Sequence, residues 1–257
     1  MFQAGADRGN ATSMTNLGWL YEKGFGVAQD YAKARKWYEE AADKDDGNAM
    51  YNLGLLYAKG QGMARDYAKA RKWYEKAADI GHPGAMTNLG VLYDNGQGMA
   101  QDYAKAREWY EKAAAKDNAN AMNHLGLLYA KGQGMAQDYA RAREWFEKAA
   151  DKGDEHAPIV AALLAREFTK ALAFADRARS LFPDDLIFES YRAHALMFLG
   201  RGEESKALYL AHKGEPVSGW DGKLWERVIV GAFSDFREAG LTHPMMADIE
   251  KELGVSP

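Results

Sequence analysis

The chain has 257 residues, a net charge of −4 and no cysteine. A small negative charge gives no general attraction for the phosphate backbone of nucleic acids, and the absence of cysteine excludes disulfides and thiolate metal sites. The apolar fraction of 47% is ordinary for a folded chain, and no run of about 18 apolar residues is present to span a bilayer.

A unit of 36 residues recurs along the first part of the chain, beginning at Met14, Met50, Met86 and Met122 without insertion or deletion. A fixed period of this size is typical of a solenoid, in which each unit buries its apolar face by stacking on its neighbours. Residues 1–13 align with the end of such a unit. We therefore expect residues 1–13 to be the remnant of a truncated preceding repeat, and a signal or an upstream domain to have been lost with its first half.

Each repeat predicts two helices. In the first copy, the first helix covers residues 11–23, because Leu17, Leu20 and Tyr21 follow the spacing of one buried stripe. A glycine recurs in the middle of this helix, where it costs about 1 kcal/mol relative to alanine. We expect these glycines to let the partner helix approach closely; they are Gly18, Gly54, Gly90 and Gly126. A Gly-x-Gly pair then ends the helix.

The second helix begins after an aspartate suited to N-capping, Asp30 in the first copy. Its buried stripe is expected to contain Tyr31, Ala34, Trp37 with Tyr38, and Ala41. The recurring tryptophans are therefore interpreted as core, and Trp109→Ala is expected to cost about 3–5 kcal/mol. The opposite face carries charged pairs at i,i+4 spacing, namely Arg35–Glu39, Arg71–Glu75, Glu108–Lys112 and Glu144–Lys148.

The pattern Leu-Gly-x-x-Tyr, Gly-x-Gly, then Asp-Tyr-x-x-Ala-x-x-Trp-Tyr/Phe-x-x-Ala-Ala resembles the Sel-one-like repeat family, a 36-residue relative of the tetratricopeptide repeat, and we expect a bacterial protein. The resemblance covers four repeats over residues 14–157. It implies an all-α fold, a right-handed α/α superhelical solenoid of helix-turn-helix repeats with a C-terminal helical cap.

After residue 157 the pattern breaks. Residues 158–217 resemble tetratricopeptide-like helix pairs, and residues 218–257 are interpreted as the helical cap, because terminal units of solenoids present a polar end. The cap is expected to hold one long amphipathic helix and one short helix that begins near Pro244 and stops at Gly254. This tail also resembles the closing segment of bacterial repeat proteins that carry a peptidase domain elsewhere.

No motif with catalytic or cofactor chemistry is found. The glycine pairs lack the strand and the Gly-Lys-Ser/Thr sequence that phosphate-binding loops require. The six histidines form no i,i+4 pair and no His-Glu-x-x-His motif, and no Gly-x-Ser-x-Gly sequence is present. We therefore expect no catalytic residue, no cofactor and no metal.

In arrays similar to tetratricopeptide repeats, the first helix of each pair lines the concave side. Solvent-facing positions of that helix form columns, and we expect them to bind the partner; the candidate residues are Asn16, Trp19, Lys23, Tyr51, Asn52, Lys59, Asn88, His124 and Lys131. The asparagines Asn16, Asn52 and Asn88 form one column with His124, and two interpretations of this column are open. Its side chains bind an extended peptide, or they form hydrogen bonds with the backbone of a neighbouring repeat. Trp19, Tyr51 and His124 depart from the consensus and are the candidates for specificity.

The favoured function is a non-catalytic protein–protein interaction scaffold or adaptor that binds a peptide or protein segment on the concave face. The alternative is a regulatory or substrate-docking domain of a larger bacterial enzyme, for example a peptidase, so that an upstream domain of the same chain is a further partner. A stand-alone enzyme is the third and least supported class. We expect a soluble protein without nucleic-acid binding or membrane insertion; the lack of cysteine favours the cytoplasm and is also compatible with the periplasm.

Overall fold

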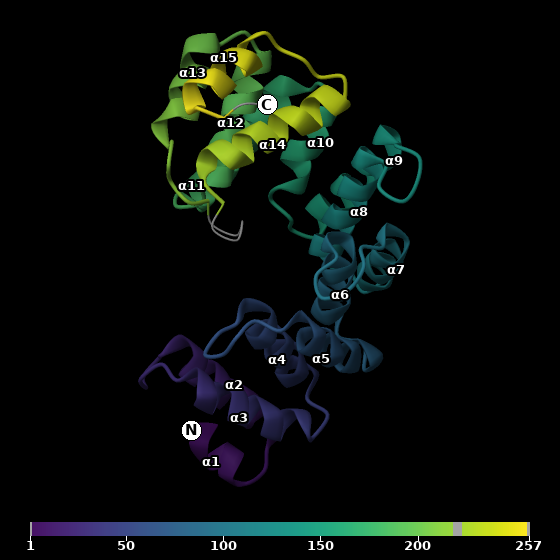
Figure 1. The fold of residues 1–257 in the computed structure, drawn as a ribbon, viewed down its shortest axis with the longest axis vertical. Coiled ribbons are helices and arrows are strands. Elements are labelled where there is room, and N and C mark those ends of the chain that lie inside the picture. The colour runs from purple at the N-terminus through teal and green to yellow at the C-terminus, as the bar shows by residue number, and fades with distance from the viewer. Residues whose placement is uncertain (1, 218–222, 256–257) are drawn as a thin grey trace. The chain divides into compact units, whose positions relative to one another are not determined.

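The computed structural model describes residues 2–217 and 223–255, and these residues form helices and no strand (Figure 1). The helices are α1 (Phe2–Asp7), α2 (Ala11–Lys23), α3 (Tyr31–Ala42), α4 (Gly47–Lys59), α5 (Tyr67–Asp79), α6 (Pro83–Asn95), α7 (Tyr103–Ala114), α8 (Ala119–Lys131), α9 (Tyr139–Asp151), α10 (Ala157–Leu164), α11 (Phe168–Leu181), α12 (Leu186–Phe198), α13 (Gly202–Ala211), α14 (Trp225–Glu238) and α15 (Met245–Leu253). An antiparallel bridge joins Pro216 to Leu224. The all-α prediction is confirmed.

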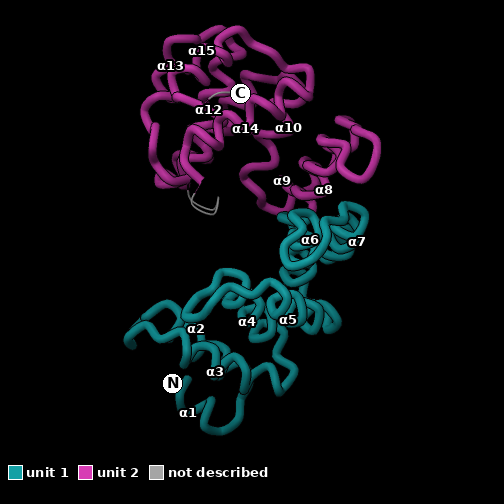
Figure 2. Tube along the Cα trace, viewed as in Figure 1, with its two compact units in different colours: residues 1–121 teal, residues 122–257 magenta. Residues whose placement is uncertain are grey.

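The chain divides into two compact units, residues 1–121 and residues 122–257 (Figure 2). The division falls inside α8 and follows the packing of the chain. The boundaries after residues 13, 157 and 217 follow the repeat pattern instead, and they stay predictions. Each unit is described below by itself.

The helix ends of the first unit are set by the residues that the sequence singled out. The Asp30 carboxylate accepts a hydrogen bond from the Lys33 backbone N–H at 2.9 Å, and Asp66 and Asp102 cap α5 and α7 in the same way. At the other end of α2, Gly24 has φ of 73°, the left-handed conformation that glycine adopts without strain. The expected first helix, residues 11–23, is confirmed in both of its bounds.

The core of each repeat is built from alanines around one aromatic ring. In α3, Ala34, Tyr38 and Ala41 are completely buried. The ring of Tyr38 lies against Gly18 of α2, and the same pairing joins α4 to α5 and α6 to α7. Small residues on one helix and a large ring on the other are what close helix packing requires, so the predicted role of the mid-helix glycines is confirmed.

The tryptophans, in contrast, are not the centre of the core, and that prediction was wrong. Their side chains are half-buried, whereas the next residue along each helix is fully or almost fully buried; these residues are Tyr38, Tyr74, Tyr110 and Phe146. A lysine one turn on covers the outer face of three of the tryptophans. Its Nζ lies 4.4 Å from the Trp73 ring centroid, 4.1 Å from that of Trp109 and 4.3 Å from that of Trp145.

Two of the four charged pairs expected on the outer face are present, and the lysines of the other two lie over tryptophan rings. Arg35–Glu39 and Arg71–Glu75 are present at 3.6 and 3.5 Å. Lys112 and Lys148, which were expected to face Glu108 and Glu144, are the lysines that lie over Trp109 and Trp145. Each tryptophan therefore belongs to the outer surface of the repeat as much as to its interior.

The second unit ends in the helices α14 and α15, which confirms the long and the short helix expected between residues 224 and 254; residues 218–222 and 256–257 of the predicted cap lie outside the described residues. Trp225 anchors the start of α14: it is fully buried, and its indole N–H donates to the Tyr209 carbonyl oxygen at 2.7 Å. Arg237 on α14 makes two hydrogen bonds, of 2.7 and 2.8 Å, to the buried Glu250 carboxylate on α15. These contacts join the last two helices to the rest of the unit.

Candidate functional site

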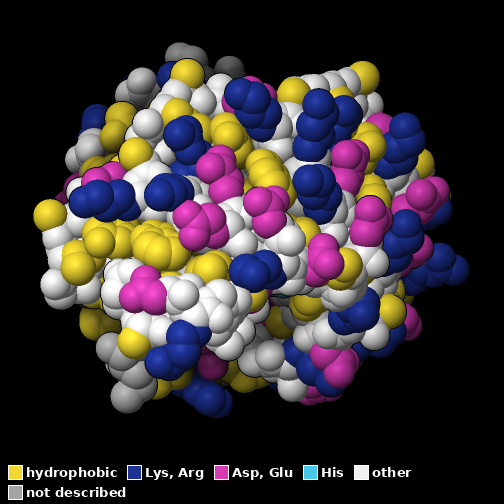
Figure 3. Space-filling model, turned by 90° about the horizontal axis from the view of Figure 1, so that it is seen from below, with side chains coloured by type: hydrophobic (Ala, Val, Ile, Leu, Met, Phe, Trp, Pro, Cys, Tyr) yellow, Lys and Arg dark blue, Asp and Glu magenta, His cyan; other side chains and the backbone are white. Residues whose placement is uncertain are grey.

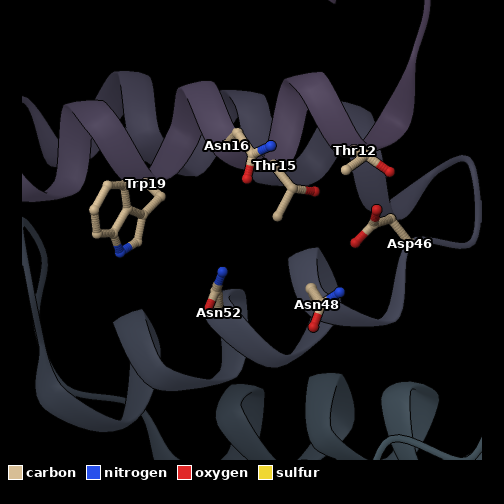
Figure 4. A pocket seen from close by; sticks show the side chains of 7 residues that line it. All are labelled: Thr12, Thr15, Asn16, Trp19, Asp46, Asn48 and Asn52. Carbon is tan, nitrogen blue, oxygen red and sulfur yellow. The ribbon is translucent and has the colours of Figure 1, made fainter. Parts of the chain in front are cut away.

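An open groove lies between α2 and α4 in the first unit, with a volume of about 380 Å³ (Figure 4). It is lined by Thr12, Thr15, Asn16, Trp19, Asp46, Asn48 and Asn52. Of the residues predicted from the sequence, the groove brings together Asn16, Trp19 and Asn52.

The regular spacing of α2 and α4 places these side chains together. Residues 12, 15, 16 and 19 are three or four apart, so they share one face of α2. On α4, residues 48 and 52 are one turn apart and extend from the other side of the groove, as Figure 4 shows. Asp46 caps α4, because its Oδ1 accepts from the Ala49 backbone N–H at 2.9 Å. The groove is therefore a consequence of two adjacent first helices with polar residues at equivalent positions.

The wall of the groove is polar and almost uncharged. Asp46 supplies its one carboxylate among the lining residues, and the other polar groups are amides, hydroxyls and an indole N–H. Thr15 is 8% exposed, and its Oγ1 has no hydrogen-bond partner in the described part of the chain. A buried hydroxyl without a partner is costly unless a ligand or water satisfies it.

An exposed aromatic pair stands at one end of this wall. Trp19 is 42% exposed and Phe25 is 57% exposed, and their rings meet edge to face with centroids 5.3 Å apart. Sequence reasoning missed Phe25, although a signal was available. The equivalent position in the other three repeats is glutamine, at Gln61, Gln97 and Gln133. It also missed Thr12, Asp46 and Asn48, which become neighbours only when the helix pairs stack.

Tyr51 and Asn88 lie at the junction between the second and third repeats. The Tyr51 ring stacks on His82 with centroids 4.7 Å apart, and burial raises the pKa of Tyr51, an effect that hydrogen bonding to Asn88 partly offsets. Burial also raises the pKa of Tyr74, and hydrogen bonding to the Asn88 amide partly offsets this increase. His82 Nδ1 accepts from the Ala85 backbone N–H at 3.1 Å, and burial lowers the pKa of this histidine. At this position the amide column therefore contacts a neighbouring repeat.

The lysines predicted for the site lie at helix ends. Lys23 pairs with Glu22 at 2.7 Å, and Lys59 is exposed at the end of α4. Neither is among the residues that line the groove.

His124 and Lys131 belong to the second unit, where they line a different cavity. Lys131 Nζ pairs with Asp235 on α14 at 3.0 Å. Burial lowers the pKa of His124 to about 4, although the nearby Asp154 carboxylate acts in the opposite direction. The nine predicted residues therefore do not share one site. Three line the groove and two line the cavity of the second unit, and the other four lie at the junction of the second and third repeats or at helix ends.

The described residues contain no cluster of three or more potential metal ligands. None of the helices in the described part is long and apolar enough to cross a membrane. On the face of the molecule in Figure 3, lysine and arginine side chains are interspersed with aspartate and glutamate. That face carries no continuous patch of one sign.

The Sel1 repeat matches the chain four times in succession, at residues 11–46, 47–82, 83–118 and 119–154. Each matched segment begins three residues before the methionine that starts the repeat in the sequence analysis. The segments together cover more than half of the chain, and each contains one complete helix pair. None of the curated proteins is similar enough in sequence to match.

Solved structures give the same result. A Sel1 repeat protein from Oxalobacter formigenes is 30% identical, with a TM-score of 0.66 over 78% of this chain and 84% of that one. The protective antigen c5321 of uropathogenic Escherichia coli, which has an SLR fold, is 28% identical, with a TM-score of 0.67 over 98% of this chain and 58% of that one. A tetratricopeptide repeat protein from Parabacteroides merdae, 16% identical with a TM-score of 0.51 over 95% of this chain and 98% of that one, shares the fold. The repeat matches and these structures together show that the chain belongs to the Sel1 repeat family of helical solenoid proteins.

Proposed function

We propose that this protein is a non-catalytic scaffold that binds an extended segment of another protein in the groove between α2 and α4. Repeat proteins of this type are generally protein-interaction scaffolds. The observation that carries the proposal is the juxtaposition of Asn16 and Asn52 across one open groove that ends at the exposed Trp19.

The chemistry of the wall suits a peptide backbone. A primary amide both donates and accepts hydrogen bonds, so the side chains of Asn16, Asn48 and Asn52 can pair with successive backbone N–H and C=O groups. The unpartnered Thr15 hydroxyl offers a further hydrogen bond at the base of the wall. Such contacts hold a peptide in register with little regard to its sequence.

The aromatic pair supplies the apolar part of the interaction. Large aromatic side chains dominate the energy of protein interfaces where a partner covers them. Trp19 and Phe25 are exposed and already packed against each other, so they form a preorganised platform for one apolar side chain of the partner. We infer that the partner segment carries an aromatic or large aliphatic residue near one end.

The test uses the full chain, immobilised and exposed to a phage-displayed library of random 12-residue peptides. We expect enrichment of uncharged peptides with one large apolar residue. Asn16→Ala/Asn52→Ala should weaken the enriched peptides at least tenfold, because about 1 kcal/mol is lost for each hydrogen bond. Trp19→Ala should weaken them by a similar factor.

The matched control is Lys36→Ala/Lys72→Ala, which changes two exposed residues of the second helices. Binding should be unchanged in that variant. The proposal would be contradicted if no peptide were enriched, or if the control variant lost as much binding as the groove variants. Thermal melts of all variants exclude loss of the fold as the reason.

The docking-domain alternative places the same groove in a larger bacterial enzyme, with the partner segment in the same polypeptide. The enriched peptide sequence distinguishes the two cases: the alternative expects it to match a segment of the same reading frame, whereas the scaffold expects it to match another protein.

A further inference from the structure

The second unit contains a larger and more apolar cavity than the groove of the first. Its volume is about 570 Å³, which lies within the range of small-molecule sites in proteins. Its lining residues come chiefly from α8, α10, α12 and α14. We propose that this cavity is a binding site for a neutral, mainly apolar small molecule that carries a hydrogen-bond donor such as a hydroxyl or an amine N–H.

Contacts at both ends of α14 hold the cavity open. At the start of the helix, the Trp225 indole is bonded to the Tyr209 carbonyl oxygen. At its end, Asp235 pairs with Lys131 at 3.0 Å, and the Glu238 carbonyl oxygen accepts from the Tyr139 hydroxyl at 3.1 Å. The middle of the helix therefore spans the cavity between two fixed ends.

Gly231 lies in this middle section and lines the cavity. A Cβ placed on Gly231 would meet no atom within 4 Å. Glycine inside a helix is destabilising, and here close packing does not require it, in contrast to the glycines under the tyrosine rings. Its effect in this position is to leave space in the cavity.

Buried polar atoms that face the cavity lack partners. His194 lines it, is 1% exposed, and has no hydrogen-bond partner on either ring nitrogen within the described residues. The Oδ1 atom of Asn123, also in the wall, is buried and unpartnered in the same sense. Buried polar groups are normally satisfied, and an amide oxygen can only accept. A ligand with a donor group would satisfy it.

The remaining lining selects for a neutral, apolar body. Leu127, Val160, Leu163 and Val228 are among the residues that form the wall. The charged residues in the lining include both signs: the cations are Lys131, Lys223 and Arg227, and the anions are Asp235 and Glu238. A ligand with a net charge would gain little from such a mixed set and would lose its hydration.

The proposal is tested with N-phenyl-1-naphthylamine, a neutral probe with a single N–H donor whose fluorescence rises in apolar surroundings. The anionic 8-anilino-1-naphthalenesulfonate has the same skeleton with an added charge. We expect the full chain to bind one molecule of the neutral probe, at least fivefold more tightly than the sulfonate. Preference for the sulfonate, or no fluorescence rise with the neutral probe, would overturn the proposal.

Two variants of α14 form a matched pair. Both positions are exposed, but Gly231 lines the cavity and Ser234 does not, so Gly231→Leu places a side chain at the cavity and Ser234→Leu places the same side chain outside it. Gly231→Leu should weaken the neutral probe at least tenfold while the melting temperature rises, because glycine is removed from a helix. Ser234→Leu should bind as the unmodified chain does. Equal binding by both variants would overturn the site.

A third variant tests the polar group. His194→Phe keeps an aromatic ring in place and removes both nitrogens, so the affinity for the neutral probe should fall about fivefold. Unchanged affinity in this variant would overturn the assignment of His194 as a ligand contact.

Discussion

A Cβ placed on Gly18 would stand only 2.7 Å from Cε1 of Tyr38, so the tyrosine ring lies directly against the backbone of α2. The Tyr38 hydroxyl continues past this contact and donates to the Glu22 carboxylate at 2.9 Å, one turn further along α2. Burial and the Glu22 charge both raise the pKa of Tyr38. The pair therefore fixes both the distance between the two helices and their register.

Gly18→Ala is the first prediction. The methyl group gains up to about 1 kcal/mol in helix propensity but overpacks the contact with Tyr38, which typically costs 1–3 kcal/mol. We expect a net loss of about 1 kcal/mol in the free energy of unfolding, measured in urea. Gly231→Ala is the matched control, since its Cβ meets nothing within 4 Å, and it should gain stability. A gain in both variants would contradict the role of Gly18 as a close-contact glycine.

The burial of the aromatic residues predicts unequal costs for neighbouring substitutions. Tyr110→Ala removes a completely buried ring and should cost about 3–5 kcal/mol. Trp109→Ala removes a half-buried ring covered by Lys112 and should cost about 1–2 kcal/mol, since part of the ring already contacts water. Urea denaturation of the two variants measures both values. Equal losses would restore the sequence-based view that the tryptophans form the core.

The lowered pKa values of His124 and His194 predict a dependence of stability on pH. The pKa of His124 is lowered from about 6.5 to about 4 in the folded protein, chiefly by burial. The stability it contributes is therefore complete above pH 6.5 and is lost as the pH falls toward 4. Between pH 7 and pH 5 the loss from this residue should be about 2 kcal/mol.

Asparagine occupies the position of His124 in the other three repeats, at Asn16, Asn52 and Asn88, which makes His124→Asn the natural variant. The free energy of unfolding, measured in urea at pH 7 and at pH 5, should fall between these pH values in both proteins. The fall should be about 2 kcal/mol smaller in His124→Asn than in the unmodified chain. His194, whose pKa burial lowers to about 3, continues to contribute in both proteins. The same fall in both would contradict the effect of His124.

The ion pair between Arg237 on α14 and Glu250 on α15 predicts how substitutions at these two residues change stability. Glu250 is 2% exposed, and Arg237 holds both of its oxygens. Arg237→Met leaves this carboxylate buried without its partner, which should cost on the order of 2 kcal/mol, less than for a fully buried pair because water reaches Arg237. Arg237→Met/Glu250→Met should recover most of the loss. A double variant no more stable than the single one would show that the pair itself contributes net stability.

The sequence predicted the local structure well because each signal is local. Asp30 caps a helix through its own third neighbour, and Gly24 ends one through its own backbone angle, so their roles can be recognised from the 36-residue pattern. The burial of Trp109 could not be recognised in this way. Trp109 and Tyr110 are adjacent on one helix, and which of them faces the core depends on the rotation of that helix against its partner.

The site was predictable only in part for the same reason. Asn16 and Asn52 occupy equivalent positions in successive repeats, so their proximity follows from the period. The cavity beside α14 involves residues more than a hundred positions apart, such as Lys131 and Asp235, and no repeat relates them. The position of a residue in its repeat predicts its neighbours in the next repeat. It does not predict contacts with α14, which lies outside the four repeats.

The contact of Asn88 in the third repeat with Tyr51 in the second shows that the order of the repeats matters. Threonine or asparagine stands at the position of Tyr51 in the other copies, at Thr15, Thr87 and Asn123, so the second repeat alone among the four has a tyrosine there, and that tyrosine stacks on His82. His82 also caps α6, and its Nε2 lies 3.3 Å from Oδ1 of Asn48. Exchanging the second and third repeats would keep almost every consensus residue and would move Tyr51 and His82 together. It would still replace Asn88 by its equivalent in the fourth repeat, His124, as the residue that follows Tyr51 in the stack. The near-identical units are therefore not interchangeable parts, and the chain specifies the sequence in which they stack.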